Sequence, residues 1–145
     1  MKKFIFIFIL MVPFLHAQNY FWNDVDLPLQ QLFTKMGTPD GVEYQKKSNI
    51  YWMAYDFGDV AVMYVIDKGF VRSVLYMKST KDFDSVYKPF IELQEKSLED
   101  GFIIKKTKDI IGHYIQVKND IQIVGDISQI KDEFILTILI SRMKK

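Results

Sequence analysis

The sequence contains no cysteine among its 145 residues. Disulfides, thiolate metal sites, cysteine nucleophiles and thiol redox chemistry are therefore excluded, and the stability of the fold must come from packing. An excess of one charge is also lacking, because 19 basic side chains are matched by 18 acidic ones. This balance gives no indication of a nucleic acid or an anionic membrane as the partner.

No hydrophobic run is long enough to span a bilayer, and the most apolar one lies at the start of the chain. A basic start at residues 1–3 is followed by an apolar run over residues 4–12 and by a segment that ends on the small residue Ala17. This pattern is typical of a secretory signal peptide. Its apolar core of about twelve residues is shorter than the roughly twenty that cross a membrane. Cleavage after Ala17 predicts a periplasmic or secreted protein with no integral membrane segment.

The residue after the predicted cleavage site indicates whether the mature protein could carry a lipid anchor. A bacterial lipoprotein requires a cysteine there, and this chain has Gln18. We therefore expect a soluble product. Residues 18–145 suffice for one compact domain and hardly for two independent ones, so we predict a single domain.

Local patterns predict two helices and eight strands. Apolar residues at helical spacing indicate a helix over residues 27–36, with Asp26 as its N-cap and Gly37 at its C-terminal end. A second helix is expected over residues 84–100, ending at Gly101. Runs of β-branched and aromatic residues predict strands over residues 42–47, 50–57, 60–66 and 70–77, and then over 102–107, 110–118, 121–125 and 134–141.

This order of elements predicts an α+β fold with two helices packed on antiparallel sheet. Shifting the chain by 60 residues aligns Gly41 with Gly101 and Lys46 with Lys106. One interpretation is a tandem repeat of a helix and four strands (α-β4-α-β4), with halves 24–80 and 82–142. The other is that two similar segments obey the same patterning rules.

The strands are apolar at successive positions, which bears on function. In residues 50–57, Trp52 and Ala54 alternate with Met53 and Tyr55, so both faces of this strand are apolar. A sheet with one face in water would have polar residues at alternate positions. Two helices cannot cover both faces of eight strands. We therefore expect the uncovered face to meet another sheet, a second copy of the chain, a ligand in a cavity or a partner protein.

Catalytic patterns are few. His113 is the one histidine that remains after processing, and a local hydrogen bond within the sheet is the favoured interpretation over a general base or metal ligand. No Gly-x-Ser-x-Gly elbow or glycine-rich phosphate loop occurs. We predict no catalytic residue, metal site or cofactor, and no enzymatic activity. A hydrolase that pairs His113 with a carboxylate such as Asp56 is the least favoured alternative.

Aromatic residues supply the candidate binding residues. Trp22, Trp52 and Tyr55 are predicted to lie at an apolar surface patch that contacts a partner, although core packing explains most of the aromatic set. The function expected is an exported, non-enzymatic binding protein, a protein-interaction or inhibitor-like module whose partner is another protein or a second copy. The alternative is a periplasmic carrier of a small hydrophobic ligand, which would enclose an apolar pocket of several hundred Å³.

Two short stretches carry a family resemblance. Residues 32–39, followed by a strand, an aromatic hairpin and the run at residues 68–71, resemble the helix and three-strand pattern of small outer-membrane assembly lipoproteins of the SmpA/OmlA type. The tandem arrangement resembles the beta-lactamase-inhibitor-protein architecture, in which an exposed surface binds another protein. The resemblance implies an α+β fold and a protein-binding surface. The lipid-bearing cysteine is missing here, and no functional residue is carried over.

Overall fold

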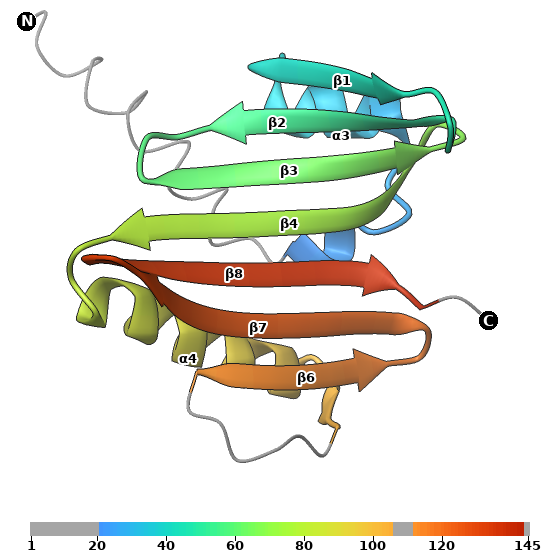
Figure 1. Ribbon diagram of the computed structural model, residues 1–145. Helices are drawn as coiled ribbons and strands as arrows, with labels where there is room; N and C mark the ends of the chain where they lie inside the picture. Colours follow the sequence, from blue (N-terminus) through green and yellow to red (C-terminus); the bar gives the residue numbers. More distant parts are fainter. Residues whose placement is uncertain (1–20, 106–111, 144–145) are drawn as a thin grey trace, which may run out of the picture.

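The computed structural model describes residues 21–105 and 112–143. The predicted signal peptide and cleavage site lie outside the described residues, as do parts of the predicted strands 102–107 and 110–118. The described residues form an eight-stranded antiparallel sheet with two α-helices and a short 3-10 helix (Figure 1). The helical segments are η1 (Phe21–Asp24), α3 (Leu29–Met36) and α4 (Asp84–Glu99).

The strands follow the expected order along the chain, four after each helix. They are β1 (Gly41–Gln45), β2 (Ile50–Asp56), β3 (Val60–Asp67), β4 (Phe70–Thr80), β5 (Ile103–Ile104), β6 (His113–Lys118), β7 (Ile121–Ile130) and β8 (Glu133–Arg142). Several turns are two residues long. At Lys68 and Gly69 both φ angles are positive, 52° and 81°, as a tight type I′ hairpin requires.

The predicted fold class was wrong. The strands do not form two separate units of one helix and four strands; they form one continuous sheet in the order β1-β2-β3-β4-β8-β7-β6-β5. The reason is the pairing of β4 with β8, which runs from Ser73 opposite Ser141 to Thr80 opposite Phe134. This pairing joins the last strand of each half, so the eight strands form one sheet.

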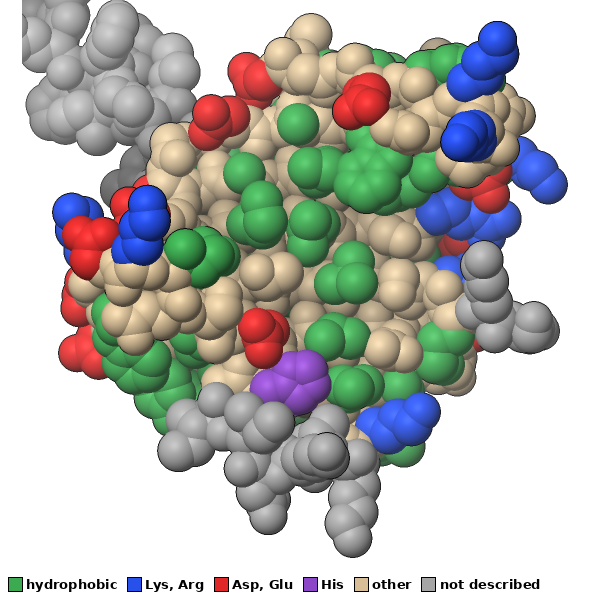
Figure 2. All heavy atoms as spheres, in the orientation of Figure 1, with side chains coloured by type: hydrophobic (Ala, Val, Ile, Leu, Met, Phe, Trp, Pro, Cys, Tyr) green, Lys and Arg blue, Asp and Glu red, His purple; other side chains and the backbone are tan. Residues whose placement is uncertain are grey.

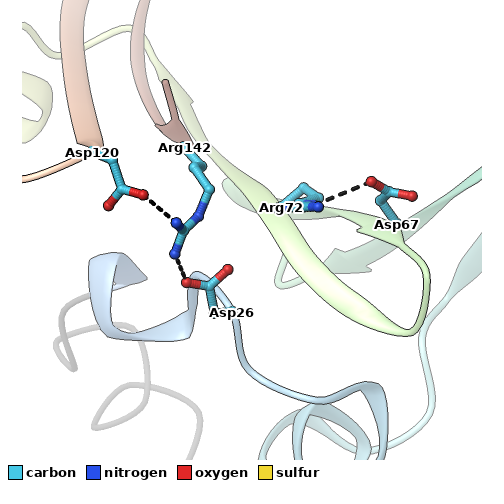
Figure 3. A network of polar contacts seen from close by, with 5 residues as sticks. All are labelled: Asp26, Asp67, Arg72, Asp120 and Arg142. Atoms are coloured by element: carbon cyan, nitrogen blue, oxygen red, sulfur yellow. Dashed lines mark hydrogen bonds and ion pairs between the residues drawn. The ribbon is translucent and has the colours of Figure 1, made fainter. Parts of the chain in front are cut away.

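The start of α3 also differs from the prediction. Asp26 does not cap the helix; Pro28 stands at the N-cap position without a side-chain hydrogen bond. Asp26 instead adopts a φ of 71° and forms an ion pair with Arg142 at the end of β8, which also contacts Asp120 (Figure 3). Arg142 therefore ties the segment before α3 to the sheet. The predicted C-cap is confirmed, since the N–H of Gly37 donates to the carbonyl of Phe33 at 2.8 Å.

All the described helical segments lie on one side of the sheet. Figure 1 shows α3 and α4 behind the strands, with α3 behind β1 and β2. Helix α4 contacts β4, β7 and β8, and η1 contacts β4 and β8. The core lies between these helices and the sheet. Its fully buried side chains include Leu32, Val62, Tyr64, Ile66, Val74, Val86, Ile123, Leu136, Ile138 and Ile140.

Polar contacts attach η1 to the sheet and to the two α-helices. The carboxylate of Asp24 in η1 is almost fully buried, and it accepts hydrogen bonds from Lys35 Nζ at 2.5 Å and from the Tyr64 hydroxyl at 2.9 Å. The indole N–H of Trp22 donates to Asp100 at 2.8 Å, just past the end of α4. These contacts place η1 against the same face of the sheet as α4, so no described helix covers the opposite face.

Candidate functional site

The face of the sheet away from the helices is the candidate site. Its side chains alternate with those of the core, and the strand register aligns them in three rows that run across β2, β3, β4, β8, β7 and β6. We call these residues the open face. The first row is Trp52, Val65, Ser73, Ser141, Gln122 and Val117; the middle row is Ala54, Met63, Leu75, Leu139, Val124 and Ile115; the third row is Asp56, Ala61, Met77, Thr137, Asp126 and His113.

The open face is apolar at its centre. Every residue of the middle row is apolar, and every residue of the three rows is at least partly exposed. Figure 2 shows hydrophobic side chains spread over this face, with most of the charged side chains towards its margins. An antiparallel sheet that faced water on this side would place polar side chains there. The described residues 21–105 and 112–143 therefore leave a contiguous apolar surface without a covering layer.

Charged groups lie at the two ends of the third row. Asp56 is on β2, whereas Asp126 and His113 are on β7 and β6. His113 Nδ1 lies 3.3 Å from Asp126 Oδ1, and both side chains are partly exposed. Strands β3, β4 and β8 contribute no ionisable residue to the three rows. A partner could therefore exclude water from the centre of the open face without burying a charged side chain.

The structure does not bring His113 to Asp56. Five strand spacings separate the two residues along the row, which corresponds to about 24 Å. The neighbour of His113 is Asp126, which lies directly opposite it on β7. Within the described part of the chain, no third histidine or acidic residue joins this pair in a cluster that could hold a metal ion.

The three predicted binding residues fall on two different faces. Trp52 lies on the open face, half-buried, and its buried indole N–H has no hydrogen-bond partner among the described residues. Trp22 and Tyr55 lie on the helix side and are only 4% and 2% exposed. Tyr55 donates its hydroxyl to the carbonyl of Gly37 at 3.1 Å, and Trp22 packs edge-on against Phe102. Only Trp52 of the three presents surface to a partner in this fold.

The central residues of the open face were not singled out from the sequence. Because β2 is apolar at successive positions, its two faces could not be told apart. The later strands carry the signal that resolves them: Gln122, Thr137 and Ser141 alternate with buried residues and mark the side away from the core. When the same alternation of buried and outward-facing positions is followed through the strand register, Met63, Leu75 and Leu139 fall on the open face.

A hollow lies at the edge of the helical layer. It holds about 140 Å³ and is lined by Phe83, Gly112, Ile127, Ser128, Gln129 and Phe134. It is open to the surface and well below the several hundred Å³ expected for a hydrophobic carrier. Neither helix of the described residues is both long and apolar enough to cross a lipid bilayer.

Comparison with known proteins gives a fold but no family. No protein-family model and no curated protein matches the chain. The structure is similar to that of a cysteine-rich secretory protein from Staphylococcus aureus, with a TM-score of 0.53 and 11% identity over 83% of this chain and 45% of that chain. It is also similar to an extracellular protein containing an SCP domain from Bacillus anthracis, with a TM-score of 0.52 and 12% identity over 87% of this chain and 46% of that chain.

These similarities correct the predicted resemblance. The similar solved structures are a cysteine-rich secretory protein and an SCP-domain protein, so the likeness to SmpA/OmlA-type lipoproteins and to the beta-lactamase-inhibitor-protein architecture was wrong. The chain spans less than half the length of either protein. At this level of identity the comparison establishes a shared fold alone.

Proposed function

We propose that this chain is an exported, non-enzymatic binding module whose open face docks on a protein partner. The observation that carries the proposal is the uncovered middle row, which is apolar from Ala54 on β2 to Ile115 on β6. Removing apolar surface from water contributes about 25 cal/mol per Å². Contiguous apolar patches larger than a few hundred Å² mark interaction sites on soluble proteins.

The size of the open face suits a protein partner. Six strands at about 4.8 Å spacing and three rows at about 6.8 Å spacing place the outer Cα positions roughly 24 Å by 14 Å apart. Side chains that extend about 3 Å beyond these positions give an area of about 600 Å², which is the lower limit per partner for a stable protein interface. A drug-sized ligand needs a concave site, and the hollow of about 140 Å³ is smaller than such a ligand requires.

Two observations support export. The first is the signal-peptide pattern of residues 1–17. The second is that the similar solved structures are a secretory protein and an extracellular protein. A binding role outside the cytoplasm agrees with both, and the mature chain would meet its partner in the periplasm or outside the cell.

Site-specific photocrosslinking tests the proposal. A photoreactive amino acid is placed at Leu139 on the open face, or at Val42 on β1, which is 58% exposed and belongs to the helix-side row. Each variant is expressed in the native host and irradiated, and adducts are identified by mass spectrometry. We expect a discrete protein adduct from position 139 and none from position 42.

A second variant links the adduct to the predicted binding residue. Trp52→Ala, combined with the crosslinker at position 139, should lower the adduct yield several-fold while the protein stays folded by circular dichroism. The absence of any discrete adduct from positions 139, 63 and 124 would overturn the proposed function.

A further inference from the structure

We infer that the partner on the open face is a second copy of this chain, packed face to face about a two-fold axis that runs parallel to the strands between β4 and β8. The inference rests on the proposed function, because it names the occupant of the same surface.

The strand order fixes which strands meet. A two-fold axis between β4 and β8 reverses the order of strands across the sheet and preserves position along each strand. The order β2-β3-β4-β8-β7-β6 therefore places β4 on the partner's β8, β3 on the partner's β7 and β2 on the partner's β6. Each row of the open face then meets the same row of the second copy, as an isologous interface requires.

The middle row is self-complementary in this arrangement. Leu75 meets the partner's Leu139, Met63 meets the partner's Val124, and Ala54 meets the partner's Ile115. Every contact joins two apolar side chains, and towards the ends of the row the small Ala54 meets the larger Ile115. Packed sheets lie about 30° from alignment because each is twisted, so these pairings hold best near the axis. The two strands at the axis, β4 and β8, bring only Ser, Thr, Leu and Met from the three rows.

The third row supplies charge complementarity. Asp56 meets the partner's His113, whose other neighbour is its own Asp126 at 3.3 Å. The imidazole of His113 and two carboxylates, its own Asp126 and the partner's Asp56, would then share one corner of the interface, offset by the rotation between the two sheets. Asp126 itself meets the partner's Ala61 and keeps its contact with His113.

The alternative face-to-face arrangement lacks this match. A two-fold axis across the strands would place each strand on its own copy and would exchange the first row with the third. Asp56 would then meet the partner's Trp52, and His113 would meet the partner's Val117. Charges buried against apolar groups destabilise an interface. The positions of Asp56 and His113 therefore favour the axis parallel to the strands.

Complementary charge variants test both the association and its geometry. Sedimentation velocity of the mature protein should show a dimer at concentrations of tens of micromolar, as a small but well-matched interface would give. Met63→Lys and Val124→Glu each place two unpaired charges in the dimer, so each variant alone should sediment as a monomer at that concentration.

Mixing the two variants should restore the dimer. The mixed pair contains one Lys–Glu contact at the mutated positions and one native Met–Val contact. Positions 63 and 124 are three strand spacings apart in one chain, about 14 Å, so the two new charges would not pair within a single molecule. Val42→Glu, an exposed substitution on the helix side of β1, is the matched control and should leave the dimer unchanged.

The outcomes separate the inference from the proposed function. A wild-type chain that stays monomeric at all concentrations, single variants that still dimerise, or a mixture that stays monomeric would each overturn the inference. A monomer that still crosslinks through position 139 to a different protein would overturn the second copy and leave the binding function standing. A monomer without any adduct would overturn both. Thermal unfolding of each variant checks that the fold is retained.

Discussion

Leu139 on β8 lies directly opposite Leu75 on β4 at the centre of the open face, and 38% of Leu139 is exposed. Leu136, three positions earlier on the same strand, points to the helices and is fully buried. One strand thus carries the same side chain on both faces of the sheet. This arrangement allows the proposed contribution to binding to be separated from the contribution to folding.

Alanine substitutions at these two leucines should therefore have different effects. Leu136→Ala leaves a cavity in the core and should lower the free energy of unfolding by about 2–5 kcal/mol. Leu139→Ala removes a side chain that is already partly in water and should lower it by less than about 1 kcal/mol. Urea denaturation at a concentration too low for association gives both values. Equal losses at the two positions would contradict the assignment of Leu139 to a binding surface.

A close approach between two strands gives a second prediction. The ring of Tyr114 on β6 covers Gly125 directly opposite on β7, and a Cβ added at Gly125 would overlap the ring atoms. Tyr114 cannot turn aside easily, because its ring also packs against Phe90 with centroids 5.0 Å apart. Gly125→Ala should therefore lower the free energy of unfolding by about 1–3 kcal/mol, as overpacking does.

The matched control for this substitution is Gly41→Ala on β1. A Cβ there would meet only the Cβ of Ala54, at 3.9 Å, which is an ordinary contact. Thermal or urea unfolding of the two variants should show a loss for Gly125→Ala and almost no change for Gly41→Ala. Similar stabilities would mean that the Tyr114 ring moves without cost.

The sequence predicted the elements better than their assembly. Strands such as β2 and β3 and the helix α4 have clear local signals, since turn residues and apolar spacing act over a few positions. The pairing of β4 with β8 joins residues as far apart as Ser73 and Ser141. No local pattern specifies such a contact, so the single continuous sheet was not predicted.

Two errors in detail have physical causes. We expected the seventh strand to end at Gly125, but β7 continues to Ile130, because its later residues pair with β8 as far as Ile130 opposite Glu133. We placed Trp22 at a surface because it belongs to the aromatic set that could contact a partner. The structure buries it, since its indole N–H reaches Asp100 beyond α4 and its ring packs on Phe102.

Four buried tyrosines, Tyr55, Tyr64, Tyr76 and Tyr114, make the fold sensitive to alkali. Burial raises the pKa of Tyr76 to about 12 and also raises those of Tyr55, Tyr114 and Tyr64, and for Tyr64 the charge of Asp24 raises it further. These folded-state pKa values lie above the value of about 10 expected in the unfolded chain. Each group therefore contributes stability that is fully present below about pH 10 and is lost as the pH rises through the folded pKa.

The free energy of unfolding should accordingly fall as the pH is raised above about 10, with phenolate absorbance and loss of circular dichroism appearing together. Tyr76→Phe removes one of these groups and should make this fall less steep. Tyr44→Phe changes a tyrosine that is 49% exposed and should leave the slope unchanged. If all tyrosines ionise while the circular dichroism of the folded protein persists, the buried hydroxyls are open to water, and the packing described for Tyr64, Tyr76 and Tyr114 is incorrect.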